Sequence, residues 1–404
     1  MTFERPSAPP PRLAEVVLSV DRHGLANGLV AFLFAATGPL AILLAVATDG
    51  GLSGADISSW VFGAYGLGGV ISILFSILYR QPMAMAWTIP GTVLLIPAFD
   101  HLSFPEIIGA YLASGVLIAV LGATGWVGRI MATIPLPIVM GMVAGVFLPF
   151  GLGIIGAFHE VFWVSLATVI AFVGLSLMPA LSRLFPPVLG ALVAGLLVVV
   201  LSGQFMPDSA ADVALVRPIL YAPSFSARAM VELVIPLTLT VVAIQNAQGF
   251  TVLRAAGYAP PVNVLTFACG LATLGFAAVG SVPACVTGPA NAILNSSGRH
   301  ERRYAGGVVF GVLMLLFGLF SPLAIGFALG LPTAFIAVLG GLAMLRVLQT
   351  AFTAAFSQGF PLSALIAFLV TLSDLTIAGV GAAFWGLVFG FATAWSFERE
   401  HFGS

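Results

Sequence analysis

The stretch SVPACVTGPANAIL, residues 281–294, interrupts a very apolar chain with Thr287-Gly288-Pro289. A second stretch, MAWTIPGTVLL at 85–95, places Thr88-Ile89-Pro90 in similar surroundings. Proline lacks a backbone N–H and fits the first turn of a helix better than its interior. We therefore interpret each stretch as a short extended segment followed by a half-helix that begins inside a bilayer. The alternative is an ordinary proline kink, which neighbouring helices accommodate.

The composition places the chain in a membrane. Its 404 residues are 60% hydrophobic and only 7% charged, whereas soluble domains carry about 25% charged residues. Many apolar runs approach the ~20 residues of a membrane-spanning helix, while barrel strands are shorter and alternate. The net charge of -1 provides no basic surface for nucleic acid. The sequence predicts an all-α integral membrane protein in a lipid bilayer, with no nucleic-acid partner.

The reactive side chains argue against an enzyme. All 14 basic residues are arginine, which removes lysine Schiff-base chemistry and a P-loop. Cys269 and Cys285 lie in apolar stretches and are interpreted as small core residues. No Cys/His cluster has the spacing of metal ligands, and no nucleophile is paired with a base. We expect no metal, no cofactor and no catalytic residue.

The apolar segments predict fourteen crossings with both termini on one side. Residues 1–24 would form a cytoplasmic tail with an interfacial helix, because the Pro-rich, charged start lacks the apolar core of a cleavable signal. Seven crossings occupy 25–204 and seven occupy 229–397. An extracytoplasmic loop at 205–228 separates them, and a cytoplasmic tail covers 398–404.

The arginines support this count. Cytoplasmic segments carry an excess of arginine and lysine, and only Arg217 and Arg228, both in the central loop, fall outside. The other twelve fall on the cytoplasmic side: Arg5, Arg12, Arg22, Arg80, Arg129, Arg183, Arg254, Arg299, Arg302, Arg303, Arg346 and Arg399.

An odd number of crossings in each half requires the second copy of a repeat to be inverted. The third crossing (83–98) and the tenth (281–297) both carry the Gly/Pro break, and the fifth and twelfth carry Leu136-Pro137 and Leu331-Pro332. Interrupted segments at matching positions of two halves indicate a transporter binding site. We therefore expect a 7+7 inverted repeat in which spans 3 and 10 are a strand plus a half-helix.

Polar residues near the breaks are the candidate binding residues. A helix N-terminus attracts anions, and three amides in one apolar helix are costly unless bonded. Because no cation lies within a predicted span interior, we expect hydroxyls, amides and helix ends to hold an anion; interhelical hydrogen bonding is the alternative for the amides. The candidate substrate-binding residues are Thr88, Pro90, Gly91, Thr92, Gln245, Asn246, Gln248, Thr287, Gly288, Pro289 and Asn291.

Two acids are candidates for proton coupling. Asp374 lies in the thirteenth span, near its outer end, where a solvated or capping role would also explain it. Glu232 lies at the mouth of the eighth span. Ionisable groups in spans often mark proton pathways.

Three stretches resemble the benzoate/proton symporter family: YRQPMAMAWTIPG (79–91), IQNAQGFTVLRAAGYAPPVN (244–263) and RRYAGGVVFGVLMLLFGLFSP (302–322). The similarity covers nearly the whole chain from about residue 20, and the family is related to the uracil and nucleobase/ascorbate transporters. The resemblance implies core and gate domains, with substrate between spans 3 and 10. It implies import of benzoate or a similar aromatic carboxylate with protons, by alternating access, in a bacterial-type inner membrane. Relatives with this fold suggest a homodimer.

Two features bear on the substrate. The nucleobase relatives carry an acid in the eighth span, where this chain has only the amides Gln245, Asn246 and Gln248. The stretch Ser281–Cys285 lacks the His or Asn of the family pattern before its half-helix. The alternatives are therefore a transporter of the same fold for another small organic anion or a nucleobase-like solute, with or without coupling to protons.

Overall fold

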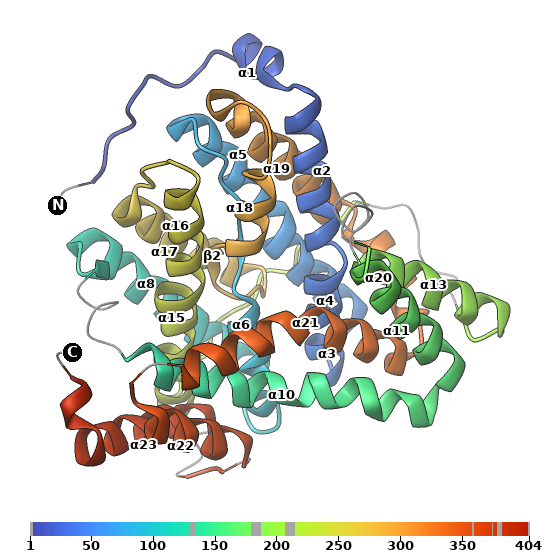
Figure 1. Ribbon diagram of the computed structural model, residues 1–404, viewed down its shortest axis with the longest axis vertical. Helices are drawn as coiled ribbons and strands as arrows, with labels where there is room; N and C mark the ends of the chain where they lie inside the picture. The colour runs from blue at the N-terminus through green and yellow to red at the C-terminus, as the bar shows by residue number, and fades with distance from the viewer. Residues whose placement is uncertain are drawn as a thin grey trace.

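The computed structural model describes residues 3–128, 135–178, 187–206, 215–357, 359–373, 375–377 and 382–402. Its first half is helical apart from strand β1 (Figure 1). The elements are α1 (Leu13–Ser19), α2 (Arg22–Ala35), α3 (Gly38–Asp49), α4 (Gly54–Val61), the π-helix η1 (Phe62–Leu67), α5 (Gly68–Tyr79), β1 (Met85–Trp87), α6 (Ile89–Val93), α7 (Leu95–Phe99), α8 (Phe104–Thr124), α10 (Leu136–Glu160), α11 (Phe162–Ser176) and α13 (Pro187–Leu201).

The second half repeats this pattern of long helices around one short strand. Its elements are α14 (Ala227–Ala229), the π-helix η2 (Met230–Val234), α15 (Ile235–Leu239), the π-helix η3 (Thr240–Asn246), α16 (Ala247–Ala255), α17 (Val262–Ala278), β2 (Ala284–Val286), α18 (Gly288–Leu294), the 3₁₀-helix η4 (His300–Arg302), α19 (Arg303–Leu319), α20 (Ser321–Leu329), α21 (Thr333–Phe356), α22 (Pro361–Leu372), α23 (Ala382–Phe397) and the 3₁₀-helix η5 (Arg399–His401).

Apolar helices of membrane-spanning length confirm the predicted class. Within the described residues, seven helical stretches are long and apolar enough to cross a membrane, and six apolar helices are shorter. The first half contributes four of the long stretches and the second half three. They are Arg22–Asp49, Gly54–Tyr79, Phe104–Thr124, Leu136–Glu160, Ala227–Ala255, His300–Leu319 and Thr333–Phe356.

The two Gly/Pro breaks form the predicted strand and short helix. β1 and β2 pair antiparallel, with Ala86 opposite Cys285. Each strand passes through one threonine, the N-cap residue, into a helix with proline in its first turn: Thr88 before α6 and Thr287 before α18. The proline therefore starts a helix at both places, and the continuous kinked helix is excluded.

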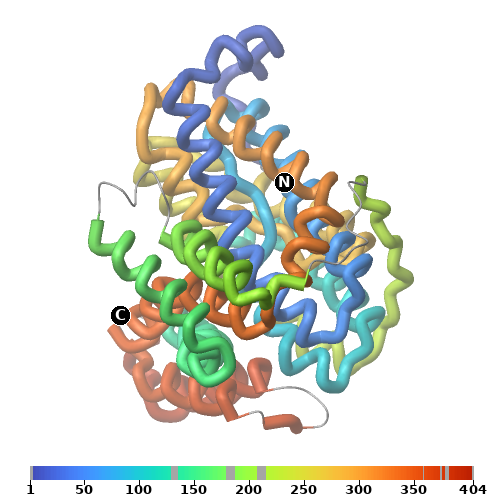
Figure 2. Tube along the Cα trace, turned by 90° about the vertical axis from the view of Figure 1, so that its right-hand side faces the viewer, coloured from blue at the N-terminus to red at the C-terminus, as the bar shows by residue number. Residues whose placement is uncertain are grey.

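Two groups of helices surround this centre. One contains both strands, with α8 packed on α17, α5 on α19 and α2 against α18 and α19. The other contains α10, α11, α13, α21, α22 and α23, in which α10 and α21 lie along each other. Figures 1 and 2 both show α10 beside the C-terminal helices α22 and α23. The first group is called the strand group below and the second the α10–α21 group.

Prolines set where the two long helices of the α10–α21 group begin. Pro137 lies in the first turn of α10, and Pro332 is the N-cap of α21. Farther along, Gly341 of α21 contacts α10, because a Cβ at this position would lie 2.5 Å from the carbonyl oxygen of Phe150. Small residues permit such close approach of helices in membranes.

Candidate functional site

A cavity of about 480 Å³ lies where the two groups meet. The strand group, which includes α6, η3 and α16 beside the strands, contributes residues from α2, β1, α6, η3, α16, α18 and α19, and the α10–α21 group contributes residues from α10 and α21. Pro39 of α3 also lines the cavity. Most of the lining is apolar. The polar side chains that line it are Gln245, Gln248, Thr251, Thr287, Arg346 and Thr350.

Five of the eleven predicted binding residues line this cavity: Pro90, Gln245, Gln248, Thr287 and Pro289. They come from three segments that are far apart in the sequence, as the interpretation of the breaks required. The other six predicted residues do not line the cavity. They are Thr88, Gly91, Thr92, Asn246, Gly288 and Asn291.

The two threonines that precede the short helices have different surroundings. The Thr88 hydroxyl accepts a hydrogen bond from Gly91 N at 3.1 Å and is paired with the Thr240 hydroxyl at 3.1 Å. The Thr287 hydroxyl has no hydrogen-bond partner among the described residues. An unpaired buried hydroxyl is unfavourable, so the Thr287 hydroxyl has unused bonding capacity beside the cavity, whereas the Thr88 hydroxyl is already paired.

Asn291 and Asn246 hold the strands instead of facing the cavity. Asn291 Oδ1 accepts from Ala84 N at 3.0 Å, and its Nδ2 donates to Ala84 O at 3.1 Å. Asn246 Oδ1 accepts from Val286 N at 2.8 Å. These bonds to the backbone of the two strands give both amides a structural role, and neither residue lines the cavity, while Asn246 Nδ2 has no partner among the described residues.

The two glutamines are better placed. Gln245 is buried and Gln248 is exposed, both line the cavity, and neither amide has a hydrogen-bond partner among the described residues. Gln248 packs against Gly288, where any Cβ would clash with the Gln248 side chain. Gly288 therefore makes room for the glutamine rather than contacting a ligand itself.

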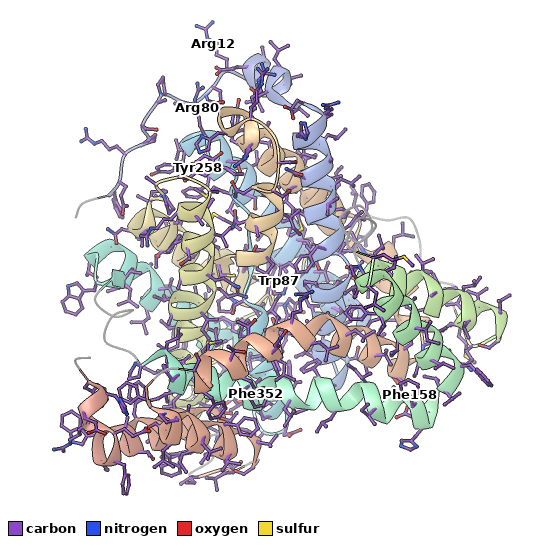
Figure 3. The ribbon with its side chains drawn as sticks, viewed as in Figure 1. Arg12, Arg80, Trp87, Phe158, Tyr258 and Phe352 are labelled. Carbon is purple, nitrogen blue, oxygen red and sulfur yellow. The ribbon has the colours of Figure 1, made fainter. Side chains whose placement is uncertain are left out.

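Trp87 forms part of the cavity wall, at the end of β1. Figure 3 places it near the middle of the molecule. Its ring centroid lies 4.4 Å from that of Tyr65, whose hydroxyl donates to Ala35 O at 2.6 Å. Packing against Tyr65 holds the indole in place and gives the cavity an aromatic wall at the end of β1 that pairs with Ala284.

Arg346 corrects the expectation that no cation lies within a span. It sits inside α21 rather than in a cytoplasmic loop, and its side chain lines the cavity. The sequence contained the signal, because residue 346 falls well within an apolar run that begins after Pro332. Assigning the arginine to the cytoplasmic side by charge alone concealed its position.

The stretch that departs from the family pattern is buried. Ser281, Val282, Ala284 and Cys285 are almost completely inaccessible, and no residue of 281–285 lines the cavity. The backbone N–H of Ala284 donates to the Thr273 hydroxyl at 3.0 Å. These side chains therefore pack in the interior and do not line the described cavity.

The two proton-coupling candidates lie apart from the cavity. Glu232 is buried in η2, and its Oε2 lies 2.9 Å from His101 Nε2. Arg228 donates to the backbone oxygen of His101 at 3.4 Å. Neither Glu232 nor His101 lines the cavity. Asp374 lies outside the described residues.

Solved structures show where this fold occurs. The transmembrane domain of a cyanobacterium bicarbonate transporter, BicA, superposes with a TM-score of 0.61 at 15% identity over 92% of this chain and 97% of that one. SLC26A9 gives 0.63 at 11% identity, covering 95% of this chain and 65% of that one. Murine Slc26a9, an anion transporter in the inward-facing state, gives 0.62 at 13% identity, covering 98% and 73%. The chain has a helical membrane transporter fold similar to theirs.

Sequence comparisons show the family. The pattern of the benzoate membrane transport proteins, BenE, matches residues 19–395. Inner membrane protein YdcO of Escherichia coli strain K12 is 32% identical over 381 residues, covering 93% of this chain and 95% of YdcO. The benzoate membrane transport protein of Acinetobacter baylyi is 29% identical over 371 residues, covering 90% and 92%. This multi-pass integral membrane protein therefore belongs to the BenE family of benzoate membrane transport proteins.

Proposed function

We propose that the protein imports benzoate or a similar aromatic carboxylate together with protons, by alternating access between its core, the strand group, and its gate, the α10–α21 group. The observation that carries this proposal is the cavity between the groups, where Trp87, Gln245, Gln248 and Thr287 converge. The family supports it, because a relative from Acinetobacter baylyi is named a benzoate membrane transport protein.

The cavity suits a small aromatic acid. Ligand sites are typically clefts of about 300–1,000 Å³ with apolar walls and a few placed polar groups, and this cavity has about 480 Å³. The benzene ring would lie against Trp87 and the apolar wall. The carboxylate would accept hydrogen bonds from the Thr287 hydroxyl and from the amide nitrogens of Gln245 and Gln248. None of these groups has another partner among the described residues.

A second cavity supports alternating access. It has about 580 Å³ and is lined by residues of α3, α10 and α21, including Asp49, Pro149 and Thr333. The first cavity touches the same three helices at other positions. Buried apolar side chains lie between the residues that line the first cavity and those that line the second. They include Phe147 on α10 and Leu339 on α21. Rocking of one helix group against the other would open one cavity while closing the other.

Proton coupling has an electrical reason. An anion that enters a negative-inside cell works against about 2.3 kcal/mol per charge per 100 mV, and a proton that moves with it cancels this term. We assign Glu232, with His101 as its partner, as the proton carrier, because the carboxylate is buried and its contact is another titratable group. Glu232 lies along the same helical stretch as Gln245 and Gln248, which would link protonation to the cavity.

The fourteen crossings and their orientation belong to the same proposal. Within the described residues, seven long helices, six shorter apolar helices and the β2–α18 segment support a count of fourteen crossings. The arginine distribution favours both termini in the cytoplasm. The name of YdcO, an inner membrane protein, favours the inner membrane.

Uptake of radiolabelled benzoate into proteoliposomes tests the function. We expect uptake that rises with an inward proton gradient and collapses with a protonophore. Thr287→Val keeps the shape of the side chain but removes its hydroxyl, so it should reduce uptake about tenfold, the effect of one hydrogen bond to a charged group. Thr266→Val is the matched control, because the Thr266 hydroxyl is also buried and unpaired but does not line the cavity.

Specific results of the uptake measurements would contradict each part of the proposal. Full uptake by Thr287→Val, or equal losses in both threonine variants, would contradict the assigned site. Glu232→Gln should transport benzoate without responding to the proton gradient, and a gradient response that persists would remove Glu232 from the mechanism. Folded wild-type protein that takes up another organic anion but not benzoate would favour the alternative substrate class.

A further inference from the structure

Among the described residues that line the first cavity, Arg346 carries a charge and the others are neutral. It forms no ion pair among the described residues, where the ion pairs are Arg80–Glu15 and His101–Glu232. An arginine inside an apolar helix is costly unless it faces a wet cavity or a partner of opposite charge. The guanidinium therefore borders the cavity with no carboxylate of the described residues paired to it, which leaves it able to bind an anion.

Arg346 lies on the face of α21 that lines the cavity, and its side chain is exposed there. Arg346, Thr350 and Ala354 are spaced by one turn each and all line the cavity, as residues four apart on one helix face do. Gln248 and Thr251 of α16 line the same cavity. Arg346 thus belongs to the α10–α21 group, while the hydroxyl and amides assigned above belong to the strand group.

We propose that Arg346 binds the carboxylate of the transported anion and makes the cavity selective for anions over neutral aromatic molecules. A guanidinium presents two parallel N–H donors that match the two oxygens of a carboxylate. Because Arg346 and Thr287 belong to different helix groups, an anion held by both bridges the groups and draws them together. This inference rests on the proposed function, since it assigns a residue for recognising the same substrate.

Equilibrium binding to the purified full-length protein tests it, with radiolabelled benzoate as the probe and neutral benzamide as competitor. Arg346→Gln should weaken benzoate binding about tenfold to a hundredfold, because hydrogen bonds to charged groups contribute about 1.5–3 kcal/mol. Benzamide binding should change little. Arg346→Lys should restore part of the affinity, since it retains the charge but not the fork.

Arg254→Gln is the matched control, because Arg254 is exposed in the last turn of the neighbouring α16 but does not line the cavity. It should bind benzoate as the wild type does. Unchanged benzoate affinity in monodisperse Arg346→Gln protein would overturn this inference and leave the proposed function standing. Equal weakening of benzoate and benzamide would also overturn it, because it would indicate a structural role. A folded wild-type protein that binds no aromatic carboxylate would overturn both proposals.

Discussion

Replacing Asn291 by alanine should destabilise the protein rather than remove a ligand contact. The side chain forms three hydrogen bonds: Ala84 N donates to Oδ1 at 3.0 Å, and Nδ2 donates to Ala84 O at 3.1 Å and Thr287 O at 2.6 Å. These bonds tie α18 to the chain just before β1. In Asn291→Ala all three would be lost at a completely buried position.

The partners that remain determine the magnitude. Ala84 O keeps its bond from Thr287 N at 3.0 Å, but Ala84 N would have no partner. An orphaned buried N–H costs about 1–3 kcal/mol, so we expect the free energy of unfolding to fall by about that amount. The pairing of β1 with β2 would weaken, and the cavity wall at Trp87 and Thr287 with it.

Thermal unfolding in detergent, followed by loss of monodisperse protein, measures the effect. Asn295→Ala is the matched control: Asn295 Nδ2 donates to Asn291 O at 2.7 Å, but its Oδ1 has no partner. Its removal should change stability little. An Asn291→Ala protein that melts with the wild type would refute the reasoning. One that keeps its stability but loses benzoate binding would instead return Asn291 to the substrate site.

Two further changes test other parts of the structure. Gly288→Ala should push Gln248 away from α18, because the new Cβ clashes with the flexible glutamine side chain; we expect weaker benzoate binding with little loss of stability, and stability loss without a binding change would contradict this. Asp21 caps α2 by accepting from Gly24 N at 2.8 Å, and this bond holds the pKa of its carboxyl below the usual 3.8. The stabilisation of the fold by the ionised Asp21 carboxylate should therefore be present above about pH 4 and lost as the pH falls through the lowered pKa. The melting temperature of the wild type should follow this trend, and that of Asp21→Asn should depend less on pH.

The repeated Thr-x-Pro pattern made the central elements predictable. Proline at 90 and 289 favours the first turn of a helix, and the β-tolerant residues before it suit a strand, so local chemistry favours both breaks. The surrounding helices follow from apolar length alone, as Leu136–Glu160 and Thr333–Phe356 illustrate. Such features depend on each residue and its neighbours in the chain, which is why they could be predicted from one sequence.

The cavity could not be predicted in this way, because it depends on which atoms meet across hundreds of residues. Asn291 and Gln248 are both amides, and both were predicted to bind substrate. The Asn291 side chain is hydrogen-bonded to the backbone of Ala84, whereas the Gln248 side chain lines the cavity without a hydrogen-bond partner among the described residues. Thr88 and Thr287 occupy equivalent positions in sequence, yet only Thr88 finds a partner, on η3.

By itself the sequence determined that the chain is a helical membrane protein with two broken segments, because hydropathy and proline act locally. Only the tertiary structure decided which polar groups remain unpaired and which way Arg346 faces, because hydrogen-bond satisfaction and cavity lining are properties of packed helices. The candidate site is therefore the set of polar side chains that the packing left without partners at the boundary between the two helix groups.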